Sequence, residues 1–293
     1  MDGILNLDKP AGITSYGVVA RIKRLTGEKR VGHAGTLDPD ATGVLPVCLG
    51  KATRVVQYLS GFSKTYVTTI ELGVSTDTYD ASGQVTGRAD ASGIDRVQIE
   101  SILPVFTGAV SQTPPMYSAL KHHGQPLYKL ARAGVTIERP SRTVTIHRLE
   151  IIDYQPPQVT LEIESSKGTY IRSLANDIGQ ALGCGAHMKD LRRTAYGVFI
   201  IKDAVSLSRL EEGRLDQFLH PIDDALQDYP ALTVNEAGEK AMRQGKMLAA
   251  ENVKSTGGSN DGLYRAYTAG GAFIGLARYV TDSGMWRPEK LFS

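Results

Sequence analysis

Cysteine is scarce in this sequence: its 293 residues include two, Cys48 and Cys184, and they do not form a CxxC pair. Cysteines this far apart, each in an apolar or glycine-rich setting, indicate reduced core thiols and exclude a sequence-local metal or redox motif. No apolar run approaches the length of a membrane span, and the first residues, MDGILNLDKP, are too short and too acidic for a signal peptide. We therefore expect a cytoplasmic protein without a membrane segment.

The sequence also lacks the motifs of common cofactor and metal sites. Residues 43–51, GVLPVCLGK, end in Gly-Lys, but six residues instead of four separate the two glycines, and Ala52 replaces the required Ser or Thr. Residues 38–43 imitate the first positions of a calcium loop, yet position twelve is Leu49 instead of Glu. We therefore expect no cofactor and no metal ion.

Basic residues are concentrated in three stretches of the chain, although the net charge is only +2. Residues 1–64, 115–150 and 165–202 each carry a charge of +4, whereas acidic residues gather in 65–114, 151–164 and 203–230. If the basic stretches converge in the fold, they form a surface that attracts a phosphate backbone. If the acidic stretches cover them, the result is an ordinary salt-bridged surface, and charge alone does not choose between the two.

A glycine-rich acidic segment, VGHAGTLDPDATGVLP at residues 31–46, has almost no helical or strand periodicity and is flanked by apolar runs. Pro39 fixes its own φ and restricts Asp38, which is therefore presented on a stiff turn. Such presentation suits a nucleophile or a ligand, whereas Asp-Pro-Asp on its own is more often a plain turn. His33 could transfer protons, support the loop or contact RNA, and we favour support or contact.

Hydrophobic periodicity predicts an α+β protein. Strands are expected at residues 3–7, 44–49, 64–72, 143–154, 159–165, 191–194, 263–268 and 272–280. Helices are expected from Thr14 or Ser15, at 52–59, 95–106, 171–182 and 235–243, with two acidic amphipathic helices in 207–226. A capping box is expected at Asp95 and Gln98, and the glycine-rich residues 255–262 predict a flexible hairpin tip.

Residues 111–142 are basic, contain several aromatic side chains and are interrupted by four prolines. An aromatic and basic excursion from a folded core is typical of a nucleic-acid clamp. Outside it, Tyr66 near the start of a predicted strand suits either core packing or stacking on a base. Arg172 lies at the start of a predicted helix, where it could hold a phosphate or pair with Asp38. The Asp80 turn suits ordinary capping.

A series of motifs extends along the whole chain: GILNLDKPAGITS (3–15), GHAGTLDPDATGVLP (32–46), KTY (64–66), PPMYSALK (114–121), GTYIRSLANDIG (168–179) and LRRTAYG (191–197). In these motifs the sequence resembles the TruB family of tRNA pseudouridine synthases, which isomerise uridine 55 in the T loop. The resemblance implies the α+β pseudouridine synthase fold, with a mixed, mostly antiparallel sheet flanked by helices and loops. It also implies a catalytic domain at 1–230 with a thumb-like insertion at about 111–142, followed by a small PUA-like RNA-binding β domain at 231–293.

The resemblance implies roles for individual residues. Asp38 is expected to be catalytic towards a base-flipped uridine, with Arg172 as its ion-pair partner and Tyr66 stacked on the uracil. Tyr170 and Leu191 are expected to form the pocket, and His33 to contact the substrate. Contacts to the RNA backbone are expected from the basic residues of the motifs and the insertion, namely Lys9, Lys64, Lys121, Lys129, Arg132, Arg142, Arg192 and Arg193.

The implied partner is the T stem-loop of tRNA, bound by a monomer that needs no obligatory protein partner. Two other functions stay open. One is a non-catalytic RNA-binding or RNA-folding protein, which an intact acid–arginine–tyrosine set argues against. The other is a guide-RNA-dependent pseudouridine synthase, which the large thumb-like insertion argues against.

Overall fold

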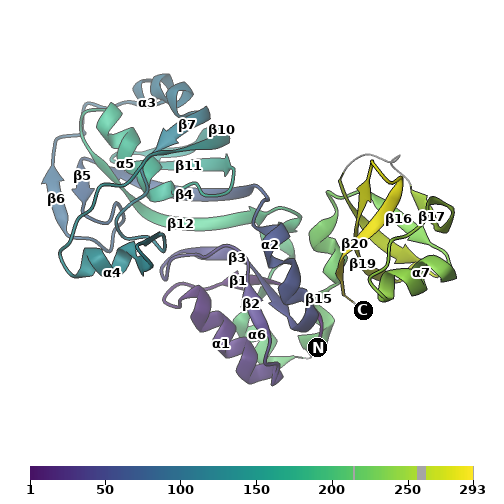
Figure 1. Ribbon diagram of the computed structural model, residues 1–293. Coiled ribbons are helices and arrows are strands. Elements are labelled where there is room, and N and C mark those ends of the chain that lie inside the picture. The colour runs from purple at the N-terminus through teal and green to yellow at the C-terminus, as the bar shows by residue number, and fades with distance from the viewer. Residues whose placement is uncertain (214, 256–261, 293) are drawn as a thin grey trace.

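The computed structural model describes residues 1–213, 215–255 and 262–292, so most of the predicted hairpin tip at 255–262 lies outside the described residues. A mixed sheet of eleven strands forms the larger body (Figure 1). Its main path is β14 (Val205–Ser206), β1 (Gly3–Lys9), β3 (Thr42–Leu49), β12 (Ala186–Tyr196), β4 (Lys64–Leu72), β11 (Gln158–Ser165), β10 (Arg142–Gln155) and β7 (Gly108–Gln112). Three short strands attach to this path: β2 (Val31–His33), β13 (Phe199–Ile200) and β15 (Leu219–His220).

The sheet has a narrow seam where β12 meets β3. These two strands are parallel and pair only at Arg192 with Thr42 and at Arg193 with Gly43. Gly43 has a φ of +99°, and a Cβ atom there would lie 2.2 Å from the carbonyl oxygen of Arg193. Because only glycine permits both that backbone conformation and that approach, the seam depends on Gly43. The loop between β2 and β3, residues 34–41, ends beside this seam, because β3 begins at Thr42.

Helices cover both halves of the sheet. α1 (Ser15–Thr26) packs on β1 and β3 through Val18, Val19 and Ile22, and Thr14 caps its first turn. α3 (Arg96–Ile102), continued by the 3-10 helix Leu103–Phe106, and α5 (Ile171–Ala181) cover one face of the half that contains β4 (Figure 1). The predicted capping box at Asp95 and Gln98 is confirmed.

Several predicted elements have different bounds. The prediction for 52–59 is partly wrong, because a 3-10 helix at Gly50–Val55 precedes a short α2 at Val56–Leu59. The two acidic helices predicted in 207–226 are replaced by α6 (Leu207–Glu212) and 3-10 turns at Leu215–Phe218 and Ile222–Leu226. Gly213 and Pro221 interrupt that stretch, and both residue types end helices. The strand predicted at 191–194 is part of the longer β12.

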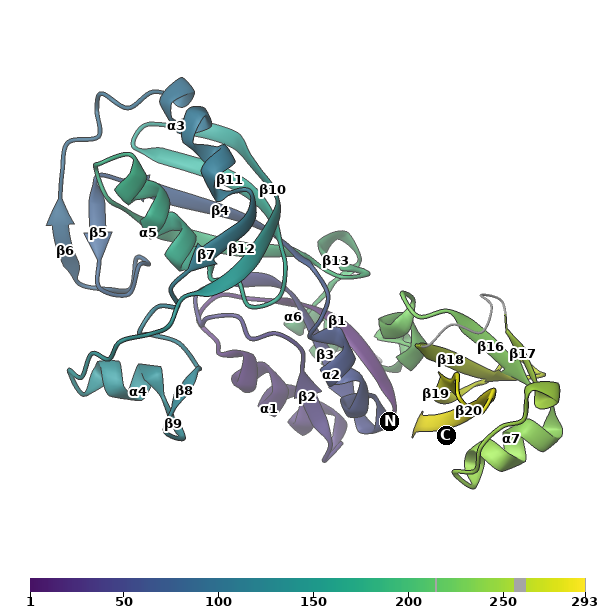
Figure 2. The same ribbon diagram turned by 45° about the horizontal axis from the view of Figure 1, so that its top comes forward.

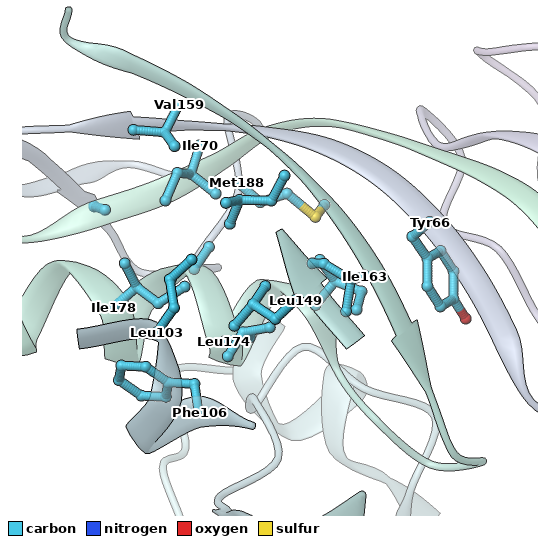
Figure 3. Packing of buried hydrophobic residues seen from close by; sticks show 14 of the residues in the cluster. Tyr66, Ile70, Leu103, Phe106, Leu149, Val159, Ile163, Leu174, Ile178 and Met188 are labelled. Carbon is cyan, nitrogen blue, oxygen red and sulfur yellow. The ribbon is translucent and has the colours of Figure 1, made fainter. Parts of the chain in front are cut away.

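The largest buried cluster lies between the β4 half of the sheet and helices α3 and α5. Figure 3 shows Ile70, Ile163 and Leu174 packed together, with Tyr66 at one end of the group. Leu37 and Ala41 of the 34–41 loop belong to the same cluster as Tyr66. The loop is therefore anchored in the core close to that ring.

A five-stranded sheet forms the smaller body at the C-terminal end (Figure 1), in the order β17 (Val253–Ser255), β16 (Ala231–Val234), β18 (Leu263–Thr268), β19 (Phe273–Val280) and β20 (Met285–Leu291). One helix, α7 (Glu236–Arg243), packs on it. Leu276 and Phe292 join the buried cluster of the larger body, and Arg54 Nη1 donates to the Leu291 carbonyl at 2.7 Å. The two bodies thus share part of their core.

Residues 113–141 leave the large sheet between β7 and β10 and project on the side of α1, as both views show (Figure 2). We call residues 113–141 the thumb. It contains a two-stranded hairpin, β8 (Lys121–His122) with β9 (Gln125–Pro126), and the short helix α4 (Leu127–Arg132). Among the described residues of the whole chain, no helix is long and apolar enough to cross a membrane.

Candidate active site

The loop at residues 34–41, which we call the catalytic loop, is held in place by side chains that lie far from it in the sequence. Lys9 is fully buried, and its ammonium donates to the carbonyl oxygens of Pro39 at 2.8 Å, Ala41 at 2.6 Å and Pro10 at 2.9 Å. The Ser15 hydroxyl donates to the Leu37 carbonyl and accepts from the Leu37 N–H, both at 2.9 Å. These bonds leave the turn that carries Asp38 little freedom.

A buried arginine forms the second support of the catalytic loop. Arg193 is 1% exposed, and it donates to the carbonyl oxygens of Val44 at 2.7 Å and Gly35 at 2.9 Å. Its guanidinium and the Lys64 ammonium both lie against the ring of Tyr196, at 5.0 and 4.5 Å from the centroid. Lys64 also donates to the carbonyls of Ser60 and Phe62. Charged groups this deep are tolerated because carbonyls and an aromatic face replace water.

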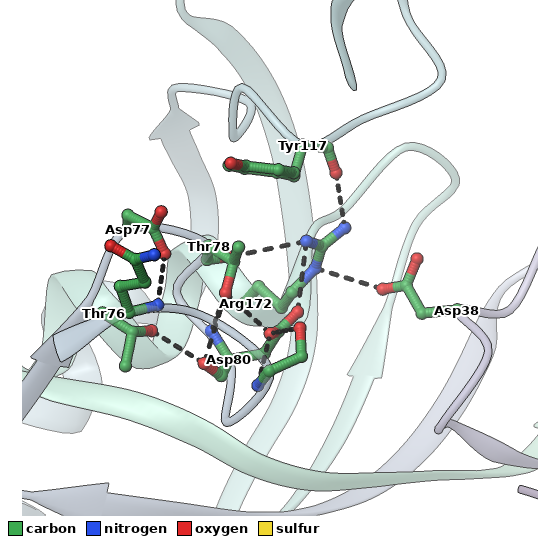
Figure 4. A network of polar contacts seen from close by, with 9 residues as sticks. Asp38, Thr76, Asp77, Thr78, Asp80, Tyr117 and Arg172 are labelled. Carbon is green, nitrogen blue, oxygen red and sulfur yellow. Dashed lines mark hydrogen bonds and ion pairs between the residues drawn. The ribbon is translucent and has the colours of Figure 1, made fainter. Parts of the chain in front are cut away.

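Arg172 is the centre of the polar network at the open end of the catalytic loop (Figure 4). It extends from the first turn of α5, is 8% exposed at the side chain, and places Nε 3.1 Å from Asp38 Oδ2. Its Nη1 lies 3.3 Å from Asp80 Oδ2, and its Nη2 donates to the Tyr117 carbonyl at 2.8 Å. One guanidinium thus joins the catalytic loop, the Asp80 turn and the thumb.

Asp80 is held more tightly than Asp38. Its Oδ1 accepts hydrogen bonds from the Thr78 hydroxyl at 2.7 Å and from the Ser82 N–H and hydroxyl at 3.0 and 2.6 Å (Figure 4). Asp38 has no comparable set of donors among the described residues, and 43% of its side chain is exposed. The Asp80 carboxylate therefore orients Arg172, whereas the Asp38 carboxylate is less constrained and partly exposed.

The pKa of Asp38 is raised above its ordinary value, because partial burial outweighs the attraction of Arg172; Asp80 also raises it. Lys9 lowers the pKa of Asp38, and Asp40 raises it slightly. Burial lowers the pKa of Lys9 itself to about 8, although the nearby Asp40 and Asp38 oppose that shift. Burial also lowers the pKa of His33, so its imidazole is neutral at pH 7.

The remaining predicted pocket residues come from β4, β12, the start of α5 and the end of β2. Tyr66 is 8% exposed on β4, and Leu191 on β12 packs on the cluster that contains Tyr66 and two residues of the catalytic loop. Tyr170 is the residue before α5, two positions from Arg172. His33 ends β2 at the start of the catalytic loop, and its Nδ1 is buried without a hydrogen-bond partner in the described part of the chain. Residues of the catalytic loop, β4 and β12 thus share one buried cluster, and Arg172 joins the start of α5 to Asp38.

The predicted RNA-binding cations divide into two groups. Lys9, Lys64 and Arg193 are buried and bonded to backbone carbonyls, so they support the protein interior and cannot serve as surface contacts. This corrects the sequence prediction for these three residues. Lys121, Lys129 and Arg132 are exposed on the thumb, and Arg192 is exposed but paired with Asp8 at 2.8 Å. Arg142 lies half-buried at the root of the thumb, with its guanidinium over the Tyr170 ring.

Sequence reasoning missed two functional groups of this site. Asp80 was assigned an ordinary capping role, which its bonds to Ser82 and Thr78 fulfil, but it also pairs with Arg172. The sequence offers either Thr14 or Ser15 as the start of the first helix; Thr14 caps α1, and Ser15 instead holds the catalytic loop. Tyr79, next to Asp80, has a left-handed backbone with a φ of 63°, which is uncommon outside glycine. The sequence contains no pattern that predicts this conformation.

Comparison with known sequences gives full-length matches. The family described as "TruB family pseudouridylate synthase (N terminal domain)" matches residues 23–171, and the "tRNA pseudouridylate synthase B C-terminal domain" matches residues 172–227. A Dehalococcoides mccartyi protein named tRNA pseudouridine synthase B is 44% identical over 296 residues, which cover 100% of this chain and 97% of the relative. A protein of the same name from Ectopseudomonas mendocina is 46% identical over 298 residues, covering 99% and 95%.

Solved structures give the same fold. A chain in the crystal structure of a Cbf5-Nop10-Gar1 complex is 30% identical with a TM-score of 0.77, covering 99% of this chain and 85% of the other. A chain in an H/ACA RNP bound to a substrate RNA containing 2'-deoxyuridine is 28% identical with a TM-score of 0.76 and the same coverage. The fold, the placement of the motifs around Asp38 and the full-length sequence matches agree: the chain belongs to the TruB family of pseudouridylate synthases.

Proposed function

We propose that this protein is a tRNA pseudouridine synthase that isomerises uridine 55 in the T loop, with Asp38 as its catalytic residue. The observation that carries the proposal is the pairing of Asp38 with Arg172, itself oriented by Asp80. The relatives at 44% and 46% identity carry the name tRNA pseudouridine synthase B, which supports tRNA as the substrate. The site residues are assigned from their positions around that pair.

The reaction breaks the N1–C1′ bond of the uridine, turns the uracil and forms a C5–C1′ bond, while C5 loses a proton and N1 gains one. A carboxylate serves this chemistry either by attacking C1′ or by removing a proton from the sugar. Both routes need Asp38 ionised, and Arg172 favours the ionised form. The substrate supplies both fragments, and the proposed reaction needs no cofactor or metal.

A uridine stacked in its loop cannot reach Asp38, so the proposal requires the base to be flipped out. Unstacking costs a few kcal/mol, which contacts in the pocket must offset. In the proposed complex the Tyr66 ring stacks on the uracil, Leu191 provides an apolar wall and Tyr170 supports the pocket. His33, which ends β2 at the start of the catalytic loop, contacts the RNA in the proposed complex.

The proposed RNA surface extends from this pocket over the thumb and Arg192. Lys121, Lys129 and Arg132 are exposed there and are suited to phosphates of the T stem. We assign residues 1–230 to the catalytic domain and residues 231–293 to a PUA-like RNA-binding domain, supported by the separate five-stranded sheet. We further propose that the enzyme acts in the cytoplasm as a monomer without an obligatory protein partner.

Tritium release from C5-labelled uridine in a T-arm hairpin tests this function. Asp38→Asn keeps the size of the side chain and removes its charge, and we expect at least about a thousandfold loss of the single-turnover rate with RNA affinity retained. The matched control is Asp40→Asn, two residues away and exposed, which should retain most of the rate. A wild-type rate for Asp38→Asn would contradict the assignment of the catalytic residue.

Two other functions make different predictions for the same assay. A non-catalytic RNA-binding protein would bind the hairpin tightly and release no tritium. A guide-RNA-dependent synthase, suggested by the similarity to chains in Cbf5 and H/ACA structures, would be inactive until guide RNA and partner proteins are added. Activity of the purified chain on the hairpin alone excludes both.

A further inference from the structure

The two roots of the thumb lie side by side in the sheet. Gln112 is the last residue of β7, Arg142 is the first residue of β10, and the two are direct partners in the antiparallel register. All of residues 113–141 therefore leave the sheet and return to it at one pair of residues.

Both root residues contact the segment that leads into α5. Gln112 is 2% exposed, its Oε1 accepts from the Tyr170 N–H at 2.7 Å, and its Nε2 donates to the Tyr170 carbonyl at 2.9 Å. The side-chain amide thus pairs with Tyr170 as a neighbouring strand would. Arg142 places its guanidinium 4.8 Å from the centre of the Tyr170 ring and donates to the Gly168 carbonyl.

The first residues of the thumb contact the next residues of α5. The Ser173 hydroxyl donates to the Thr113 carbonyl at 2.8 Å, and Arg172 Nη2 donates to the Tyr117 carbonyl at 2.8 Å. Three residue pairs thus join the two segments: Gln112 with Tyr170, Tyr117 with Arg172 and Thr113 with Ser173. Arg172 is consequently fixed on one side by the thumb and on the other by two carboxylates.

We propose that Gln112 is a positioning residue for the reaction: from the root of the thumb it fixes Tyr170 and the first turn of α5, and so places Arg172 opposite Asp38. This inference rests on the proposed function. It explains why a glutamine is buried where apolar packing would otherwise be favoured, since no apolar side chain satisfies both the N–H and the C=O of Tyr170.

The role has a consequence for ionisation. Arg172 lowers the pKa of Asp38 against the effect of burial. If Tyr170 and Arg172 shift, that attraction weakens, and Asp38 holds its proton to higher pH. A defect at Gln112 must therefore appear as a displaced acid limb of the pH–rate profile, whereas a general loss of stability leaves the limb where it was.

The test uses Gln112→Met, which keeps the length of the side chain and removes both hydrogen bonds. We expect a loss of about 10- to 100-fold in the single-turnover rate on a T-arm hairpin, with the acid limb moved to higher pH. The matched control is Gln98→Met, because Gln98 also bonds backbone through its side-chain amide, at the capping box of α3, far from the catalytic loop. Gln98→Met should lower the melting temperature and leave the acid limb unchanged.

A second measurement does not depend on activity. Titration of ¹³C-labelled aspartate carboxyls by NMR, with Asp38→Asn to assign the signal, reports the ionisation of Asp38 directly. We expect Gln112→Met alone to move the titration of Asp38 to higher pH. When Arg172→Met is already present, adding Gln112→Met should not move it further. An unchanged titration in folded Gln112→Met, or the same shift in Gln98→Met, overturns the inference; an inactive wild-type enzyme overturns the proposed function instead.

Discussion

The catalytic loop and the thumb use the same types of residue in opposite ways. Lys9 and Arg193, which support the catalytic loop, are buried and donate hydrogen bonds to backbone carbonyls. On the thumb, Lys129 and Arg132 are exposed. The thumb is joined to the larger body where it leaves the sheet, for example by the hydrogen bond between Gln112 and Tyr170. The catalytic loop is thus held in place by buried bonds, whereas the thumb leaves its charges exposed, as the proposed binding of a phosphate backbone requires.

This difference follows from what each region has to bind. A reacting carboxylate must be held within fractions of an ångström, so its turn is supported by bonds made before the substrate arrives. A nucleic-acid surface gains most of its affinity from counterion release and tolerates adjustment of its side chains. Cations in the two regions should therefore respond differently to substitution, and the difference can be tested pair by pair.

The largest effect is expected for Arg193→Met. Removal of this guanidinium leaves the carbonyls of Gly35 and Val44 buried without their donor and should lower the free energy of unfolding by about 3 kcal/mol. Arg132→Met on the thumb should change it by less than about 0.5 kcal/mol. Urea unfolding of both variants measures the contrast, and similar losses would show that the two regions are not supported differently.

The next effect is expected at Arg172, which belongs to both regions because it contacts Asp38 and the Tyr117 carbonyl. Arg172→Met should lower the single-turnover rate by about 100-fold or more. Since Arg172 lowers the pKa of Asp38, its loss leaves burial unopposed, and the acid limb of the pH–rate profile should move to higher pH. Lys129→Met should leave that limb in place; an unmoved limb in Arg172→Met would remove Arg172 from the ionisation of Asp38.

Much of this site follows from sequence because its parts are short motifs. The stiffness of Asp38 before Pro39 is a local property, and the expected pairing of Asp38 with Arg172, implied by the family resemblance, agrees with the 3.1 Å contact. The strands β10 and β11 and the helix at Ile171–Ala181 follow from periodicity. Neighbouring residues in the chain contain the information for the turn, the strands and the helix, whereas the Asp38–Arg172 pairing is available only through the resemblance.

The errors occur where the deciding contact is remote in sequence. Lys9 and Arg193 are expected at the RNA surface because the carbonyls that hold them lie far away in the chain. These carbonyls belong to Pro39 and Ala41 for Lys9, and to Gly35 and Val44 for Arg193. Asp80 forms an ordinary acidic turn with Ser82, and its pairing with Arg172 joins residues 92 positions apart. Charge counts along a sequence cannot distinguish a buried cation that bonds backbone carbonyls from an exposed cation that contacts RNA, since both contribute the same formal charge.

A smaller effect is expected at Lys9. Lys9→Met removes the donor to Pro39 and Ala41, and it should lower kcat by about tenfold with little change in KM, because the loop loses its position while the RNA surface is unaltered. Lys129→Met should do the reverse, raising KM about threefold and reducing the salt dependence of binding by about one phosphate contact. Steady-state kinetics at several salt concentrations separate the two. If Lys9→Met raised KM and left kcat unchanged, Lys9 would be a contact to the RNA and not a support of the catalytic loop.

Lys9 also gives a pH-dependent signal. Its pKa is about 8 in the folded protein against an ordinary value of 10.5, so between these values the unfolded chain binds more protons than the folded one. Stability contributed by this position therefore rises with pH through that window. Wild type should gain stability relative to Lys9→Met between pH 8 and 10.5; a parallel pH dependence of the two melting temperatures would contradict the burial of its charge.

The smallest effect is expected for the stability of Asp38→Asn, and its sign is the opposite of that for the supporting residues. Because the pKa of Asp38 is raised in the folded protein, the folded state binds more protons than the unfolded chain above pH 3.8, and ionisation of Asp38 lowers stability as pH rises. Asp38→Asn cannot ionise and should melt at a slightly higher temperature than wild type at neutral pH, with the difference shrinking towards acid pH. Asp40→Asn, two residues away and exposed, controls for the change in net charge.

A lower melting temperature for Asp38→Asn at neutral pH would mean that the attraction of Arg172 exceeds the cost of burial. The expected gain would instead show that the loop holds its reactive carboxylate against a free-energy cost, which the buried bonds of Lys9 and Arg193 offset.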